Sequence, residues 1–531
     1  MERCKPDHFP AALRSLLAPE AYPHPVRAVE LVETHVSWIL LTGEFAYKIK
    51  RPVQYAFIDM RQLERRAFLC QEELRLNRRF APDLYLEVCA ITSVSGAARI
   101  AGEGEIIEYA VRMRQFDRAA ELDRLLLAER VETDELESFG RTLADIHAAL
   151  PAASAAEPWG HPAQIRALIL QNLSECAQSC LLARGSAQLN TLQAALDRKL
   201  QEAEPWLSAR REHCCVRECH GDLHSRNIVR LGARLYAFDC MEFEPAFRWI
   251  DVADEIALLL ADLEAGGYPG HAHAFLHGYL SQSGDYQACR LLDLYKAHRA
   301  LVRAKVAALR ATDVMGSDAQ EGLRAEQVRL IECASRTLRS RVPQLLLMCG
   351  VAGSGKTWLA QRLAPRLRAV LLRSDVERKR RAGLSAHARS GSALDQDLYS
   401  PELSADLYQH LARCAQDILS GGYNAIVDAS FARGADRARF RSLAAQLGVD
   451  VRIIHCDAPR ALLRERVSQR QRAATDESEA DVRVLDWQLT QFEPIRADEN
   501  MTVIEVETGV PDTLSEVLKR CSSSAHPGAP R

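Results

Sequence analysis

The chain has 531 residues, of which 47% are hydrophobic and 26% charged, as in an ordinary globular protein with two or more domains. Its formal net charge of −3 predicts no overall attraction to nucleic acid or to an anionic membrane. The opening stretch is polar, no apolar run reaches the roughly 18 residues of a spanning helix, and the fifteen cysteines fit reduced thiols. We therefore expect a cytoplasmic protein without a membrane segment.

The first part of the chain predicts a small sheet with one helix. Residues 26–53 are rich in β-branched and aromatic side chains, with a turn at residues 43–44. In FAYKIK the two-residue period of a strand places Lys48 and Lys50 on one face. Residues 61–79 predict a charged helix, and two strand-like runs follow, ending in a connector near residues 113–116.

Helical patterns then dominate from about residue 121 to 340, with a break at 151–162. They are interrupted by HGDLHSRN, residues 220–227, and by a strand-like run that ends at Asp239. Phosphoryl transfer to a hydroxyl uses a carboxylate that accepts the hydroxyl proton, and Asp222 suits this role. It also uses oxygen ligands for Mg²⁺, and Asn227 and Asp239 suit that role.

A kinase-like site also needs a lysine on the third strand to neutralise the α- and β-phosphates. Either Lys48 or Lys50 fits this requirement, and both are candidate ATP ligands. On the following helix, Glu72 or Glu73 is the candidate ion-pair partner of the lysine.

The HGDLHSRN loop resembles the signature of the aminoglycoside phosphotransferase family, and the resemblance extends over about residues 30–310. It implies a protein-kinase-like bilobal domain at 1–335 that uses ATP and Mg²⁺ to phosphorylate a small-molecule hydroxyl acceptor. Two departures stand out. Phe238-Asp239-Cys240 replaces Asp-Phe-Gly, and Thr42-Gly43-Glu44 replaces a glycine-rich phosphate loop. The acidic run at 241–244 predicts either a solvated turn or a site that attracts a cationic acceptor.

The second half is organised around an apolar run that ends at Gly350 and leads into GVAGSGKT and then a helix-like segment. This is the P-loop pattern, in which backbone N–H groups wrap phosphates and a helix N-terminus faces the anion. The lysine would reach the β- and γ-phosphates, and the threonine hydroxyl would hold Mg²⁺. The expected nucleotide ligands are Gly350, Gly353, Ser354, Gly355, Lys356 and Thr357.

Strand-like and helix-like runs alternate from residue 343 to about 520, which predicts an α/β domain with a parallel sheet covered by helices. The run 425–427 is a Walker-B-like strand, and Asp428 at its end would hold Mg²⁺ through water. In small P-loop kinases a carboxylate after the second strand faces the acceptor hydroxyl, which suits Asp375 in RSDVER. An arginine three residues further binds the acceptor's anionic group, which suits Arg378, whereas Arg380 and Arg381 predict solvated side chains.

Four arginines beyond residue 460 predict a lid over the phosphates, with surface ion pairing as the alternative for each. They are Arg464, Arg466, Arg470 and Arg472, of which Arg466 and Arg470 are the candidate ATP ligands. Residues 343–520 resemble the P-loop kinases that include polynucleotide, gluconate and zeta-toxin-like kinases. The whole chain resembles bacterial fusions of an aminoglycoside phosphotransferase domain and an AAA-family ATPase.

The sequence thus predicts α/β and α+β architecture: a bilobal kinase-like domain at 1–335, a P-loop kinase domain at 343–520 and a disordered tail at 521–531. We expect an ATP-dependent phosphotransferase with two sites. Alternatives are a regulatory ATP-binding protein without an acceptor and a nucleic-acid 5′-hydroxyl kinase, which the near-neutral charge disfavours. A four-residue connector at 340–343 spans at most ~14 Å, so contact between the two halves is expected.

Overall fold

The structure is a computed structural model. It describes residues 2–3, 9–55, 58–179, 187–313, 317–339, 341–384, 401–473, 481–508 and 512–522. The chain forms two compact units, one made of residues 1–172 and 207–267 and the other of residues 173–206 and 268–531. In the described ranges, no helix is long and apolar enough to cross a membrane. The tail predicted at 521–531 overlaps the last two residues of helix α16 (Thr513–Ser522) and otherwise lies outside those ranges.

The first unit contains an antiparallel sheet in the order β1-β2-β3-β4-β9-β7-β8. Its strands are β1 (Glu2–Arg3), β2 (Glu30–Glu33), β3 (Ser37–Leu41), β4 (Phe45–Lys50), β7 (Tyr85–Val94), β8 (Ala97–Ile100) and β9 (Glu105–Arg114). In β4 the predicted alternation is confirmed: Tyr47 and Ile49 are buried in a core with Trp38, whereas Lys48 and Lys50 lie on the face toward helix α1 (Leu63–Asn77). A short hairpin, β5 (Gln54–Tyr55) and β6 (Ile58–Asp59), precedes α1.

The rest of the first unit is helical with two small hairpins. The helices are α2 (Leu122–Leu127), α3 (Thr133–Ala149) and α6 (Val252–Ala265), and the hairpins pair β10 (Val216–Glu218) with β13 (Trp249–Asp251) and β11 (Ile228–Leu231) with β12 (Arg234–Ala237). Helix α6 is buried on almost every side, and its buried residues include the acidic side chains of Asp254 and Glu255 as well as apolar ones. Asp251 caps its N-terminus by accepting a 2.8 Å hydrogen bond from the Ala253 N–H.

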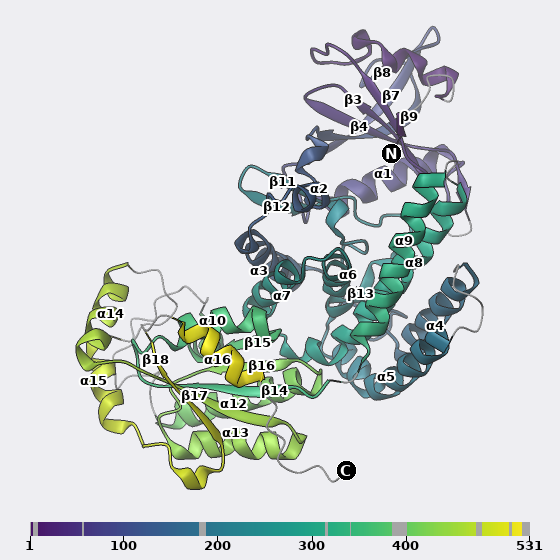
Figure 1. The fold of residues 1–531 in the computed structure, drawn as a ribbon. Helices are drawn as coiled ribbons and strands as arrows, with labels where there is room; N and C mark the ends of the chain where they lie inside the picture. Colours follow the sequence, from purple (N-terminus) through teal and green to yellow (C-terminus); the bar gives the residue numbers. More distant parts are fainter. Residues whose placement is uncertain are drawn as a thin grey trace. The chain divides into compact units, whose positions relative to one another are not determined.

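The second unit contains the predicted parallel sheet, in the order β15-β16-β14-β17-β18. The strands are β14 (Gln344–Cys349), β15 (Ala369–Arg373), β16 (Asn424–Asp428), β17 (Asp450–Asp457) and β18 (Thr502–Glu507). Helices α10 (Lys356–Leu367) and α16 lie on one face, and α12 (Pro401–Ser420) and α13 (Gly434–Leu447) on the other (Figure 1). Because both faces are covered, the central strands are continuous apolar runs.

Helices that precede the connector at 340–343 also belong to the second unit. They are the later part of α4 (Pro162–Ser179), most of α5 (Ala187–Glu212), α7 (Pro269–Ser283), α8 (Cys289–Asp313) and α9 (Ser317–Thr337). The backbones approach closely at Gly421, where a Cβ would lie 2.2 Å from the Cys289 carbonyl oxygen. Close by, Arg290 Nε lies 2.6 Å from Asp417 Oδ1. The compact units therefore divide the chain elsewhere than the connector at 340–343, because α7 and α8 pack with the P-loop sheet.

Candidate active sites

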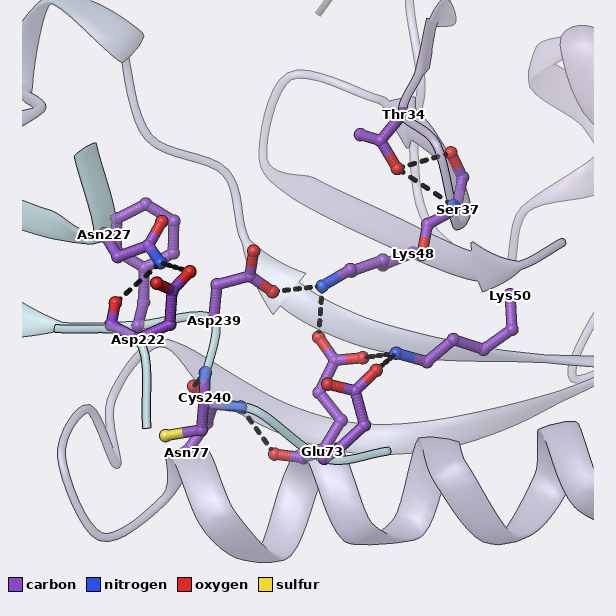
Figure 2. Close-up of polar contacts among 12 residues, drawn as sticks. Thr34, Ser37, Lys48, Lys50, Glu73, Asn77, Asp222, Asn227, Asp239 and Cys240 are labelled. Carbon is purple, nitrogen blue, oxygen red and sulfur yellow. Dashed lines mark hydrogen bonds and ion pairs between the residues drawn. The ribbon is translucent and has the colours of Figure 1, made fainter. Parts of the chain in front are cut away.

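In the first unit, Lys48 lies between two carboxylates. Its Nζ is 2.7 Å from Glu73 Oε1 on α1, and it also pairs with Asp239, which follows strand β12 (Figure 2). The residue before Glu73 on α1, Glu72, instead pairs with Arg75 at 2.8 Å. Burial lowers the pKa of Lys48, but the two carboxylates outweigh it, so the pKa is raised well above its ordinary value and the ammonium stays charged.

The HGDLHSRN loop brings Asp222 and Asn227 together. Asn227 Nδ2 donates to Asp222 Oδ2 at 3.1 Å and to the Asp222 carbonyl at 3.0 Å, and His224 Nε2 lies 3.4 Å from the same carboxylate. In Figure 2 this pair lies on the far side of Asp239 from Lys48. The three predicted groups, Asp222, Asn227 and Asp239, therefore lie along one side of Lys48.

Buried contacts fix the loop backbone. The N–H groups of His220 and Gly221 donate to the Glu255 carboxylate on α6, the former at 2.9 Å. The His220 ring donates through Nε2 to the Phe238 carbonyl at 2.9 Å, which joins the loop to the strand that leads to Asp239. Burial lowers the pKa of His220 to about 4, so this ring is neutral at pH 7 and acts as a structural donor.

Asp239 has a positive φ of 66°, which is uncommon outside glycine. The residue is held there by neighbouring groups: its N–H donates to the Tyr85 hydroxyl at 3.0 Å, and the next N–H, of Cys240, donates to Asn77 Oδ1 at 3.0 Å. Its side chain stays 41% exposed, open enough to bind a solvated cation. Strained backbone that is held by its surroundings is typical of functional positions.

Lys50 is placed differently from Lys48. Its ammonium is fully buried between Glu73 and Glu242. Neither interpretation of the acidic run at 241–244 holds at Glu242, because this carboxylate is buried with Lys50 and is neither solvated nor open to an acceptor. Burial raises the pKa of Glu242, although Lys50 opposes the shift.

The turn that replaces a glycine-rich loop has a partner that the sequence did not indicate. Gly43 adopts φ +98°, and its N–H donates to the side chain of Gln115 at 2.8 Å. Gln115 N–H in turn donates to the Glu44 carbonyl at 2.9 Å. The β3–β4 turn is therefore held by the connector after β9, a contact across 72 residues with no local sequence signal.

In the second unit, the P-loop has the expected strand–turn–helix geometry. Gly350, with φ +137°, has no room for a side chain, since a Cβ would lie 2.3 Å from the Cys456 carbonyl oxygen. Thr357 Oγ1 donates to Asp428 Oδ2 at 2.6 Å, and Lys356 Nζ donates to the Val351 carbonyl at 2.8 Å. Burial raises the pKa of Asp428, the Walker-B-like carboxylate.

A cavity of about 290 Å³ opens over this loop. Its polar lining comes from six helices, the ends of two strands and their connecting loops, with six basic side chains against three Asp. The charged lining residues are Lys356, Arg373, Asp375, Arg378, Asp428, Arg433, Asp436, Arg466 and Arg470. Such an excess of positive charge suits polyphosphate ligands.

Helix α11 (Ser374–Arg381) carries the predicted acceptor residues. Asp375 and Arg378 both line the cavity and pair at 3.2 Å. The prediction that Arg380 is merely solvated is wrong: it is held by Glu377 Oε1 at 3.1 Å and donates to the carbonyls of residues 281 and 282 near the end of α7. Arg381 pairs with the exposed Asp406.

The predicted lid arginines separate into different roles. Arg466 on α14 (Arg460–Ala473) donates to the Gly353 carbonyl at 3.2 Å and to the Thr508 carbonyl at 2.9 Å, so it supports the phosphate loop. Arg470 lines the cavity, whereas Arg464 pairs with Asp486 at 2.7 Å on the surface. On helix α15 (Val482–Gln491), Gln488 accepts a 2.7 Å hydrogen bond from the N–H of Ala352, a P-loop contact that the sequence did not indicate.

The donor atoms at both sites suit Mg²⁺, which prefers carboxylate, carbonyl and hydroxyl oxygens. In the first unit these are the Asp239 carboxylate and the carboxamide oxygen of Asn227, whose nitrogen faces Asp222. In the second they are the Thr357 hydroxyl and the Asp428 carboxylate, already 2.6 Å apart.

Comparison with known proteins gives two family matches. Residues 61–292 match the Phosphotransferase enzyme family, and residues 345–495 match an AAA domain. They confirm the predicted fold class, a kinase-like domain followed by a P-loop domain. Uncharacterised proteins of Mycobacterium tuberculosis and Mycobacterium bovis are each 28% identical over 450 residues, covering 84% of this chain and 88% of each relative.

Among solved structures, the chain is similar to an aminoglycoside phosphotransferase from Alicyclobacillus acidocaldarius, with 15% identity, 62% of this chain and 95% of that chain covered, and a TM-score of 0.36. It is also similar to a gluconokinase from Sinorhizobium meliloti 1021, with 18% identity, 34% of this chain and 99% of that chain covered, and a TM-score of 0.23.

Proposed function

The chain joins a phosphotransferase-family domain to an AAA domain, and from this premise we propose that it is an ATP-dependent phosphotransferase with two nucleotide sites. At each site the γ-phosphoryl group of ATP passes to the hydroxyl of a small molecule. The contact of Lys48 with both Glu73 and Asp239, beside the Asp222–Asn227 pair, carries this proposal.

At the first site, Lys48 binds the α- and β-phosphates. Asn227 and Asp239 would hold Mg²⁺, which would supply neutralisation of the phosphate charge. Asp222 takes the proton from the acceptor hydroxyl as its oxygen bonds to the γ-phosphorus. The bond between the γ-phosphorus and its bridging oxygen breaks, and ADP leaves. The Asn227 side chain orients Asp222 for this step through its 3.1 Å hydrogen bond.

At the second site, Lys356 and the P-loop amides bind the β- and γ-phosphates, and Thr357 and Asp428 would hold Mg²⁺. Asp375 faces the acceptor hydroxyl as its base, and Arg378 binds an anionic group of the acceptor. The cavity supports this assignment, since its excess of basic side chains exceeds what the charge of a magnesium-bound ATP balances. We also propose that the acceptors are small molecules and not nucleic acid, in line with the net charge of −3.

The test is transfer of label from [γ-³²P]ATP into a metabolite extract by the full-length protein. Wild type, Lys356→Ala and Asp222→Asn are compared. Each variant should lose one set of labelled products, and Asp222→Asn should lower its own products by about 10²- to 10⁴-fold, the usual contribution of a general base. Release of phosphate with no labelled metabolite would favour a regulatory ATPase, and label at nucleic-acid 5′ ends would favour a nucleic-acid kinase.

A further inference from the structure

The first unit holds a second lysine directly behind the phosphate lysine. Lys50 is two residues after Lys48 on β4, on the same face, and its side chain is fully buried. Its ammonium pairs with Glu73 Oε2 and with Glu242 Oε1, whose side chains are 0% and 6% exposed. Asp239, Lys48, Glu73, Lys50 and Glu242 therefore form one row of alternating charges.

Glu73 is shared between the two lysines. One carboxylate oxygen, Oε1, faces Lys48 at 2.7 Å, and the other, Oε2, faces Lys50. Both oxygens are thus held, which fixes the orientation of the carboxylate that positions Lys48. If Asp239 binds a metal, Lys48 would keep Glu73 as its carboxylate partner, and Lys50 would still hold the other oxygen of Glu73.

Glu242 connects the same row to the segment that carries Asp239. Besides Lys48, which joins Asp239 to Glu73, two further contacts link this segment to α1. The first is Cys240, whose N–H donates to Asn77 Oδ1 at 3.0 Å, and the second is Glu242 through Lys50 and Glu73. Asn77 itself donates to the Glu73 carbonyl at 2.8 Å. Lys50 thus joins Glu73 on α1 to Glu242 on this segment, just as Lys48 joins Glu73 to Asp239.

Stability alone does not explain such a row. Taking charges out of water is costly, and a buried ion pair is commonly no more stable than a well-packed apolar pair of similar volume. Buried ionic groups can instead fix one arrangement of their surroundings. Here the fixed arrangement would be that of Lys48 and Asp239, the two groups assigned to nucleotide and metal.

We propose that Lys50, together with Glu242, is a positioning pair for the first nucleotide site: it holds Glu73 in place behind Lys48 and holds the segment that bears Asp239. This assignment rests on the proposed function of that site. Neither residue touches the nucleotide; they set the geometry in which Lys48 and Asp239 meet it.

The test measures binding of a fluorescent ATP analogue to the full-length Lys356→Ala protein, in which the P-loop site is silenced, at a series of Mg²⁺ concentrations. Glu242→Gln should raise the Mg²⁺ concentration needed for half-maximal binding by about 3- to 10-fold, as expected for weakening one hydrogen bond to a charged group. The matched control is Glu108→Gln, because Glu108 is also a buried carboxylate paired with a basic residue of α1, Arg66, at 2.7 Å. It should leave this concentration unchanged.

A second variant separates positioning from stability. Lys50→Met/Glu242→Leu removes both partners, so no unpaired charge remains at 50 and 242, and the thermal midpoint should stay within a few degrees of the parent. Nucleotide binding should nevertheless remain weakened and need more Mg²⁺. Binding equal to the parent in this variant or in Glu242→Gln would overturn the positioning role. Absence of Mg²⁺-dependent binding in the parent itself would instead overturn the proposed function of the site, and this assignment with it.

Discussion

Lys48 and Lys50 are both buried, and their different ion-pair partners separate two residues that a strand pattern treats alike. The period of two places both on one face of β4, but only Lys48 reaches Asp239, whose side chain is open to solvent. The same separation applies on α1, where Glu73 meets the lysines and Glu72 pairs with Arg75. The tertiary partner of each side chain, and not its position in the strand or helix pattern, therefore distinguishes the two members of each pair.

Lys356→Ala should abolish most nucleotide binding by the second unit without unfolding it, because the lysine is half-buried and its ammonium donates to the Val351 carbonyl of its own loop. Losing a hydrogen bond to a charged phosphate costs about 1.5–3 kcal/mol, or about 10- to 150-fold in affinity. The measurement is titration of a fluorescent ATP analogue in an Asp239→Ala background. Lys519→Ala, outside the cavity, is the control, and equal affinity for all three proteins would refute the P-loop assignment.

His147 makes the first unit sensitive to acid. Burial lowers its pKa to about 3, so between pH 6.5 and about 3 the unfolded chain binds a proton that the folded chain does not. This contribution to stability is complete above pH 6.5 and is lost as the pH falls through that window. The free energy of unfolding should fall by up to about 1.4 kcal/mol per pH unit for this residue.

His147→Leu should remove the part of the pH dependence of the unfolding free energy that comes from His147. The readout is urea unfolding at pH 7.5 and pH 5, followed by hydrogen exchange of the α3 amides, because a chain of this size does not unfold in one step. His213→Gln, which replaces an exposed histidine of the same unit, should keep the slope. A slope unchanged in His147→Leu would show that His147 is not the group that titrates.

At the scale of elements, the features that could be predicted are those whose residues lie close together in the sequence. The P-loop, its flanking strand and helix, the β4 alternation and the HGDLHSRN loop all carry local patterns, and the structure has them in place. Contacts between distant elements carry no such pattern. Lys50 and Glu242 are 192 residues apart, and Arg380 donates to a carbonyl 98 residues away, so no local pattern predicts either pairing.

Helix α11 gives a test at this scale. Glu377 is fully buried and accepts from the Tyr286 hydroxyl at 3.1 Å and from His410 Nε2 at 2.9 Å, besides its contact with Arg380. Burial raises the pKa of Glu377, but the His410 hydrogen bond and the Arg380 charge outweigh it, so the pKa is lowered. Glu377→Gln should destabilise the second unit by about 2–3 kcal/mol, the cost of weakening charged hydrogen bonds in a buried site.

The comparison variant is Arg381→Ala, which removes an exposed ion pair from the same helix and should change stability by about 0–1 kcal/mol. Hydrogen exchange of the α11 amides distinguishes the two: exchange should accelerate in Glu377→Gln and stay near the wild-type rate in Arg381→Ala. Equal exchange in both would mean that the buried carboxylate does not hold the helix.

At the scale of the whole molecule, packing and sequence-family boundaries differ. The Phosphotransferase enzyme family match ends at residue 292, but residues 268–292 belong to the unit that contains the P-loop sheet. His273 donates to the Ala369 carbonyl on β15 at 2.9 Å, and the Tyr423 hydroxyl donates to Asp293 on α8 at 2.8 Å. The P-loop sheet is thus completed by helices that precede its own family match.

A fragment of residues 268–531 should therefore unfold at a higher temperature than a fragment of residues 343–531, and the shorter one should expose apolar surface and aggregate. Thermal unfolding with light scattering on the two fragments measures this. Both fragments lack residues 173–206, which also belong to the second unit, so they differ only in residues 268–342. The same midpoint for both fragments would show that α7 and α8 contribute nothing to the stability of the P-loop sheet.

The close approach of Gly421 to the Cys289 carbonyl restricts which residue can stand at position 421. No side chain fits at this position while the Cys289 carbonyl lies where it does, since even a Cβ would be 2.2 Å from the oxygen. Related proteins that keep α8 packed in this way are therefore constrained to glycine at position 421. A P-loop domain that descends from the same ancestor but has lost the preceding helices is released from the constraint. The residue allowed at this position therefore depends on whether α8 lies beside the P-loop sheet.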